Sequence, residues 1–126
     1  MVDAATILSV DDDEDLRELV GDVLTGAGFR VLSADSAESA LLVLESDEPI
    51  DLIVTDVVMP GLNGMALARL ARRLRPEVRI LYSSAFWPHI VTEPADRDLV
   101  RKPYLPKQLI DRVRRSLLAG PCQTPD

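Results

Sequence analysis

Five short apolar segments constrain the fold of this chain more than any other feature. They are rich in β-branched residues and cover residues 6–10, 29–34, 50–55, 78–83 and 98–101. Short runs of this kind are typical of strands that are buried on both faces of a parallel sheet. Helical patterns separate most of them. The alternation therefore predicts an α/β fold, a doubly wound five-stranded parallel sheet with right-handed crossovers and helices on both faces.

The predicted first helix has apolar residues at i, i+3, i+4 and i+7 spacing. Its apolar face comprises Leu16, Leu19, Val20, Val23, Leu24 and Ala27. Gly26 and Gly28 are expected to end it. Ser36 is expected to cap the second helix, which stops before Pro49.

The two remaining helical patterns are as regular. The first covers residues 64–74 and is expected to turn these residues inward: Leu67, Leu70, Ala71 and Leu74. The last pattern begins at Pro106 and ends at Gly120. Between them, residues 86–97 are interrupted by Pro88 and Pro94, so any helix there is expected to be short or irregular.

The length of 126 residues fits one domain, expected over residues 1–120, with a disordered tail over 121–126. A single Cys122 cannot form an internal disulfide, which favours a reducing, cytoplasmic setting. No apolar run approaches the roughly 20 residues of a membrane span, so no membrane insertion is expected. The net charge of −7 argues against general phosphate-backbone binding, and direct DNA binding is not expected.

Two clusters of arginines interrupt this acidic composition. One contains Arg69, Arg72, Arg73 and Arg75, and the other contains Arg112, Arg114 and Arg115. Each is interpreted as a solvated helix face, and a docking surface for an acidic partner is the alternative.

Polar residues follow the predicted strands, where the carboxyl ends of parallel strands meet at one edge of the sheet. They are Asp11, Asp12 and Asp13 after the first strand, Asp56 after the third, Ser84 after the fourth and Lys102 after the fifth. Taken alone, Asp56 reads as a cap or turn residue and the acidic run as a helix N-terminus. Together these positions predict a crevice in which clustered carboxylates hold Mg²⁺. A carboxylate there can act as a nucleophile towards phosphorus, while the cation and the ammonium group neutralise phosphoryl charge.

Four motifs make the chain resemble the response-regulator receiver domains of two-component signalling over residues 5–118. They are Ile7-Leu8-Ser9-Val10-Asp11-Asp12-Asp13, Thr55-Asp56-Val57-Val58-Met59-Pro60-Gly61-Leu62-Asn63-Gly64, Ser83-Ser84-Ala85 and Lys102-Pro103-Tyr104. The resemblance implies a flavodoxin-like strand order of 2-1-3-4-5. It also implies that Asp56 accepts a phosphoryl group from a phosphohistidine on a histidine kinase or a histidine phosphotransfer protein.

The resemblance assigns the other site residues as well. Asp12 is expected to bind Mg²⁺ directly and Asp11 mainly through water, with the carbonyl of Val58 completing the protein ligands. Ser84 and Lys102 are expected to contact the phosphoryl group. Such a protein is a signalling phospho-acceptor, which catalyses only its own phosphorylation and slow dephosphorylation.

Two departures from the family pattern bear on signalling. Leu99 stands where family members usually carry a switching Tyr or Phe, and the segment between Ser84 and Lys102 is about one helical turn short. Phosphorylation is therefore expected to be read through a rearranged region 85–99. The apolar Val58 and Phe86 occupy positions that help admit hydrolytic water in the family, which predicts slow self-dephosphorylation.

Two other classes of protein fit the residues less well. A phosphatase with an aspartyl-phosphate would need a second Asp at position 58, which is Val, and five consecutive acids at 11–15 would repel a flavin phosphate. The output stays open. The chain is interpreted as a regulator that acts on a downstream protein target; the alternatives are a phosphorelay intermediate or a receiver domain taken from a hybrid histidine kinase. Homodimerisation is left open.

Overall fold

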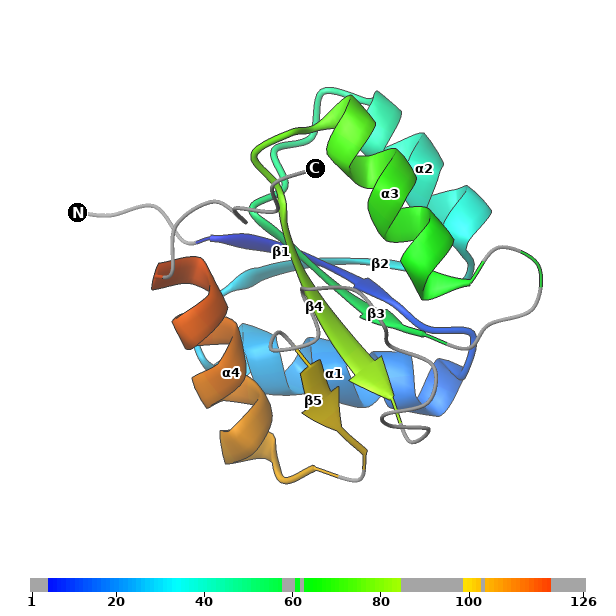
Figure 1. The fold of residues 1–126 in the computed structure, drawn as a ribbon. Coiled ribbons are helices and arrows are strands. Elements are labelled where there is room, and N and C mark those ends of the chain that lie inside the picture. Colours follow the sequence, from blue (N-terminus) through cyan, green and yellow to red (C-terminus); the bar gives the residue numbers. More distant parts are fainter. Residues whose placement is uncertain (1–4, 58–60, 62, 85–98, 103, 119–126) are drawn as a thin grey trace.

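The computed structural model describes residues 5–57, 61, 63–84, 99–102 and 104–118. Its elements are β1 (Thr6–Val10), α1 (Glu14–Gly26), β2 (Arg30–Ala34), α2 (Ala37–Glu45), β3 (Leu52–Asp56), α3 (Gly64–Leu74), β4 (Arg79–Ser84), β5 (Leu99–Arg101) and α4 (Pro106–Leu118). All strand pairs are parallel, in the order β2-β1-β3-β4-β5 (Figure 1). The predicted fold class and strand order are confirmed.

Helices cover both faces of the sheet. Helices α2 and α3 pack on one face and α1 and α4 on the other, as Figure 1 shows. Successive side chains of a strand point to opposite faces, so Leu8 and Ile53 join the α2/α3 core while Ile7 and Val54 join the α1/α4 core. This two-sided burial explains why the strands read as continuous apolar runs.

Short polar side chains begin three of the helices. Asp13 caps α1, Ser36 caps α2 and Asn63 caps α3, each by accepting a hydrogen bond from a backbone N–H three residues later. The predicted cap at Ser36 is confirmed. The predicted end of the first helix is confirmed as well, and Gly28 there adopts a φ of +100°, which residues with a Cβ rarely reach.

Two leucines predicted to face inward lie near the surface. The side chain of Leu19 is 50% exposed and that of Leu74 is 44% exposed. The buried face of α1 is narrower than its periodicity predicts, with Val20 and Leu24 as its buried residues. Leu74 is the last residue of α3 and lies against the groove that Ile50 also lines at the amino edge of the sheet.

Several predictions concern residues outside the described ranges. They include the short or irregular helix within 86–97 and the tail over 121–126. In the part of the chain that the structure describes, no helix has both the length and the apolar character to span a membrane.

Candidate functional site

The turn from β1 to α1 supplies the first two acids of the site. Asp11 directly follows β1 and is only 6% exposed, whereas Asp12 is exposed. The Asp11 carboxylate accepts a hydrogen bond from the backbone N–H of Asp13 at 3.0 Å. Asp13 turns its own carboxylate to Leu16 N as the cap of α1. Of the acids that follow β1, only Asp11 and Asp12 therefore take part in the site.

The third acid, Asp56, is the last residue of β3 and lies beside Ser83 of β4 in the strand register. The chain returns close to this point when α3 begins. Gly64 N donates to Val57 O at 2.9 Å, and a Cβ on Gly64 would lie 2.1 Å from the carbonyl oxygen of Asp56. The sequence placed Gly64 in the turn cluster after Asp56 and at the start of the third helix, without a packing reason for glycine there. The structure shows that it must be glycine because α3 starts directly against the strand end that carries Asp56.

Lys102 joins the two buried acids. Its Nζ lies 3.2 Å from Asp11 Oδ2 and 3.3 Å from Asp56 Oδ2, and its side chain is 18% exposed. Burial disfavours the charged ammonium, but the neighbouring carboxylates of Asp11 and Asp56 outweigh it. Together they raise the pKa of Lys102 above its ordinary value of 10.5. Lys102 is thus held inward as a cation, as its place after the fifth strand predicted.

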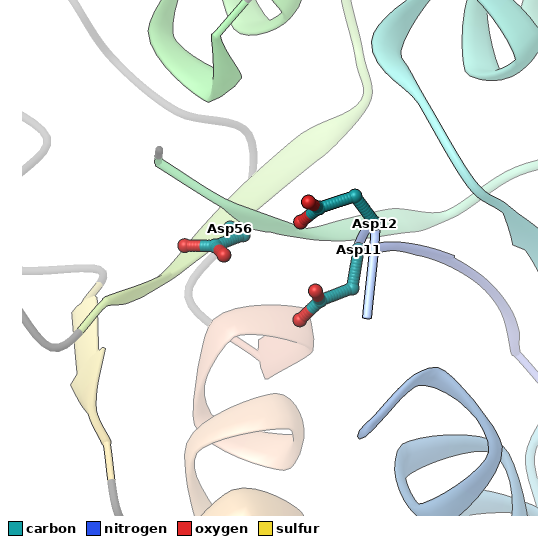
Figure 2. Close-up of side chains that lie close together, drawn as sticks. All are labelled: Asp11, Asp12 and Asp56. Carbon is teal, nitrogen blue, oxygen red and sulfur yellow. The ribbon is translucent and has the colours of Figure 1, made fainter. Parts of the chain in front are cut away.

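The three carboxylates converge on one small volume. Asp11, Asp12 and Asp56 each offer a carboxylate oxygen within 4.8 Å of the others. Figure 2 shows these side chains at the ends of two neighbouring strands, with Asp11 and Asp12 extending toward the side of Asp56. An all-oxygen donor set with several negative charges fits a hard divalent cation such as Mg²⁺.

Tyr104 lies next to the site, although the sequence did not predict a role for it there. The phenol packs against the α1/α4 core, and burial raises its pKa above the ordinary 10.0. The hydroxyl of Ser83 and the ammonium of Lys102 act in the opposite direction. Its place two residues after Lys102 was the available signal.

The remaining predicted site residues are described in part or not at all. The backbone of Ser84 ends β4 at the same edge of the sheet, paired with Arg101 of β5. The backbone of Leu99 begins β5. Val58 and Phe86 lie outside the described residues. The roles predicted for these side chains, and for the carbonyl of Val58, stay predictions.

Comparison with known proteins identifies the family. The model of the response regulator receiver domain matches residues 7–114. The chain belongs to the response regulator receiver family. The receiver domain is 32% identical over 118 residues to the response regulator receiver protein CpdR of Brucella abortus, covering 90% of this chain and 98% of CpdR. It is 37% identical to the response regulator protein FleR of Pseudomonas aeruginosa over 91% of this chain, but it spans only 25% of FleR.

Solved structures of receiver domains are also similar to this chain. A response regulator receiver protein from Sinorhizobium medicae has a TM-score of 0.81 at 31% identity, covering 94% of this chain and 98% of that chain. The receiver domain of the hybrid histidine kinase CckA has a TM-score of 0.77 at 30% identity, covering 90% and 99%. Both a receiver protein and a hybrid-kinase receiver domain are thus similar to this chain.

Proposed function

We propose that Asp56 accepts a phosphoryl group from a phosphohistidine in a Mg²⁺-dependent reaction. A carboxylate oxygen of Asp56 attacks phosphorus, the new O–P bond replaces the P–N bond, and the histidine nitrogen leaves with the electron pair of that bond. The single observation that carries this proposal is the convergence of three carboxylates and one ammonium group at one edge of the sheet.

Asp12 and Asp56 are the proposed direct metal ligands, with Asp11 acting mainly through water and the carbonyl of Val58 as a further ligand. The partners of Asp11 support this division, since its carboxylate is already held by Asp13 N and Lys102 Nζ. Asp12 is exposed and has no hydrogen bond or ion pair to any residue that the structure describes. When bound, the metal supplies positive charge to the transferring phosphoryl group.

Lys102 and Ser84 are the proposed contacts to the phosphoryl group. The Lys102 ammonium lies between Asp11 and Asp56. Once Asp56 carries a phosphoryl group, that ammonium is close to the added negative charge. Ser84 ends the neighbouring strand, where a hydroxyl can donate a hydrogen bond to a phosphoryl oxygen.

The test is phosphorylation by a small phosphoramidate donor, followed by mass spectrometry with and without Mg²⁺. The expected result is a single added phosphoryl group that depends on Mg²⁺ and disappears in Asp56→Asn. Asp51→Asn is the matched control, because Asp51 directly precedes the same strand and accepts a hydrogen bond from Thr6 N at its other end. Equal labelling of Asp56→Asn and Asp51→Asn would refute the proposal.

The pathway is proposed at the level of protein class. A histidine kinase or histidine phosphotransfer protein donates the phosphoryl group in the cytoplasm, and a protein target reads the phosphorylated form. The similarity to the CckA receiver domain supports a second candidate, in which this domain serves a hybrid kinase or a phosphorelay. Phosphotransfer profiling against the histidine kinases and phosphotransfer proteins of the host separates the two.

Slow self-dephosphorylation is proposed on the basis of two apolar residues, Val58 and Phe86. Val58→Asn combined with Phe86→Glu is expected to shorten the lifetime of the phosphorylated protein. A half-life equal to that of the wild type would count against this proposal.

A further inference from the structure

Asp11 has every one of its polar groups engaged. Its N–H donates to Ala34 O at 3.2 Å, and its two carboxylate oxygens accept from Asp13 N and Lys102 Nζ. Its main-chain carbonyl accepts from Arg17 Nη1 at 2.8 Å. Arg17 is therefore the one residue of α1 whose side chain donates a hydrogen bond to the backbone that carries Asp11 and Asp12.

Neither the sheet nor the helix provides a donor for the Asp11 carbonyl. The parallel ladders of β1 end one residue earlier, where Val10 pairs with Ala34 and with Thr55. The hydrogen bonds of α1 begin two residues later, with Arg17 N donating to Asp13 O at 2.9 Å. A buried carbonyl in this gap would lack a partner, and Arg17 reaches back from α1 to provide one.

The carbonyl that Arg17 holds belongs to the peptide unit between Asp11 and Asp12. Because this unit is planar, fixing its oxygen also fixes the nitrogen and Cα of Asp12. The Asp12 carboxylate itself contacts no described hydrogen-bonding group. Its direction toward Asp56 therefore depends on the backbone from which it extends.

The charge pattern points to the same role. Arg17 is the only Lys or Arg before Arg30, and it lies in an acidic segment at the start of α1, where the helix dipole disfavours a cation. In the described part of the chain Arg17 forms no salt bridge to a carboxylate, and its side chain donates to a neutral carbonyl instead. Charge alone does not account for this placement.

We propose that Arg17 is a positioning residue for the metal site, acting through the Asp11 carbonyl to present the Asp12 carboxylate to Mg²⁺. This inference rests on the proposed Mg²⁺ site. Removing a positive charge close to a cation site would by itself strengthen Mg²⁺ binding. The positioning role predicts that loss of Arg17 weakens Mg²⁺ binding, so the direction of the change in affinity separates the two effects.

The experiment is a Mg²⁺ titration by calorimetry of the wild type, Arg17→Ala and Arg17→Lys, with Arg30→Ala as a charge-matched control. Arg30, the first residue of β2, is exposed and forms an ion pair with Glu48. Arg17→Ala is expected to weaken Mg²⁺ binding about tenfold, as loss of a residue supporting a metal ligand commonly does. Arg17→Lys, which keeps a donor and the charge, should recover most of the affinity, and Arg30→Ala should match the wild type.

A second measurement keeps the proposal testable if Arg17→Ala folds poorly. The Asp12 amide chemical shift is compared with that of the wild type in Arg17→Lys and Arg17→Met, both without Mg²⁺. The change should be larger in Arg17→Met, because methionine keeps the apolar stem but has no donor. Unchanged or tighter Mg²⁺ binding in Arg17→Ala, or an Asp12 amide that does not respond, would overturn the positioning role alone. A wild-type protein that fails to bind Mg²⁺ would overturn the proposed function as well.

Discussion

The two edges of the sheet use the same kinds of charged residue in different ways. At the amino edge, Asp51 Oδ2 accepts from Thr6 N at 2.8 Å. Arg75 donates to the carbonyl oxygens of Leu44 and Ser46 at 3.1 and 2.8 Å, where α2 ends. At the carboxyl edge, the ammonium of Lys102 lies instead between two carboxylates.

The difference lies in the partner of each charge. At the amino edge, Asp51 and Arg75 complete the hydrogen bonds of backbone groups that strands and helices leave unpaired, so they contribute to stability. At the carboxyl edge, Lys102 faces the carboxylates of Asp11 and Asp56, and the Asp12 carboxylate has no described partner. A cluster of like charges with spare acceptors is costly in the free protein and favourable to a cation or a phosphoryl group. Four experiments test this difference between the two edges.

The largest effect is expected on phosphorylation. Lys102→Met should slow labelling of Asp56 by a small phosphodonor about 100-fold, because it removes a fixed positive charge from the developing phosphoryl charge. The measurement is the initial rate of labelling at saturating Mg²⁺. Arg75→Met, which removes a cation from the other edge, should label at the wild-type rate. Equal rates for Lys102→Met and the wild type would show that the carboxyl edge is not specialised.

Arg75→Met should have its effect on stability instead. Two carbonyl oxygens at the end of α2 lose their charged donor, and the free energy of unfolding should fall by about 1–3 kcal/mol. Urea unfolding measures this change. Arg73→Met, an exposed neighbour in α3, is the matched control and should change stability by about 0.5 kcal/mol or less. Equal stability of the two variants would show that the contacts of Arg75 to these carbonyl oxygens do not contribute to the free energy of unfolding.

Mg²⁺ should stabilise the fold through the carboxyl edge alone. At ten times its dissociation constant the ion should add about 1.4 kcal/mol to the free energy of unfolding. Asp12→Asn should lose this gain, and without metal it should be at least as stable as the wild type, because a like charge is removed. Asp51→Asn should retain the gain. Stabilisation by Mg²⁺ that survived in Asp12→Asn would place the ion elsewhere.

The smallest effect is a decline of stability in strong base. Burial lowers the pKa of Lys102, but Asp11 and Asp56 raise it more, so the folded protein holds this proton more tightly than the unfolded chain. Its stabilisation is complete below the unfolded value of about 10.5 and is lost as the pH rises through the raised pKa.

Tyr104 also makes stability fall as the pH rises, because burial raises its pKa above 10.0 in the folded protein. Stability should therefore fall above about pH 10, and Lys102→Met and Tyr104→Phe should each flatten the decline. Urea unfolding between pH 8 and pH 12 measures the slope. A wild type that declined no more steeply than either variant would contradict the assignment.

The arginine cluster of residues 69–75, in α3 and just beyond its end, is only partly a solvated face. Arg75 is bound to the carbonyl groups of α2, and Arg72 has two buried guanidinium nitrogens. These two side chains are thus largely turned into the protein. The part of the cluster open to a partner is smaller than the sequence predicted.

The amino-acid sequence alone was enough to predict the order of the strands and helices along the chain and the residues delivered to the carboxyl edge. Its apolar periods and its turn residues are local signals, and parallel strands must bring their carboxyl ends together. The convergence of Asp11, Asp12 and Asp56 with Lys102 could be predicted for that reason. The residues that support the site, and the exposed positions of Leu19 and Leu74, could not.

Those details depend on packing between distant segments, so they are visible only in the folded chain. The bond from Arg17 to the Asp11 carbonyl exists because both the ladder of β1 and the helix α1 leave that oxygen without a donor. Gly64 is required because α3 begins against the backbone of Asp56. Neither fact leaves a periodic trace in the sequence, because a close approach or an unpaired carbonyl appears only once the chain has folded.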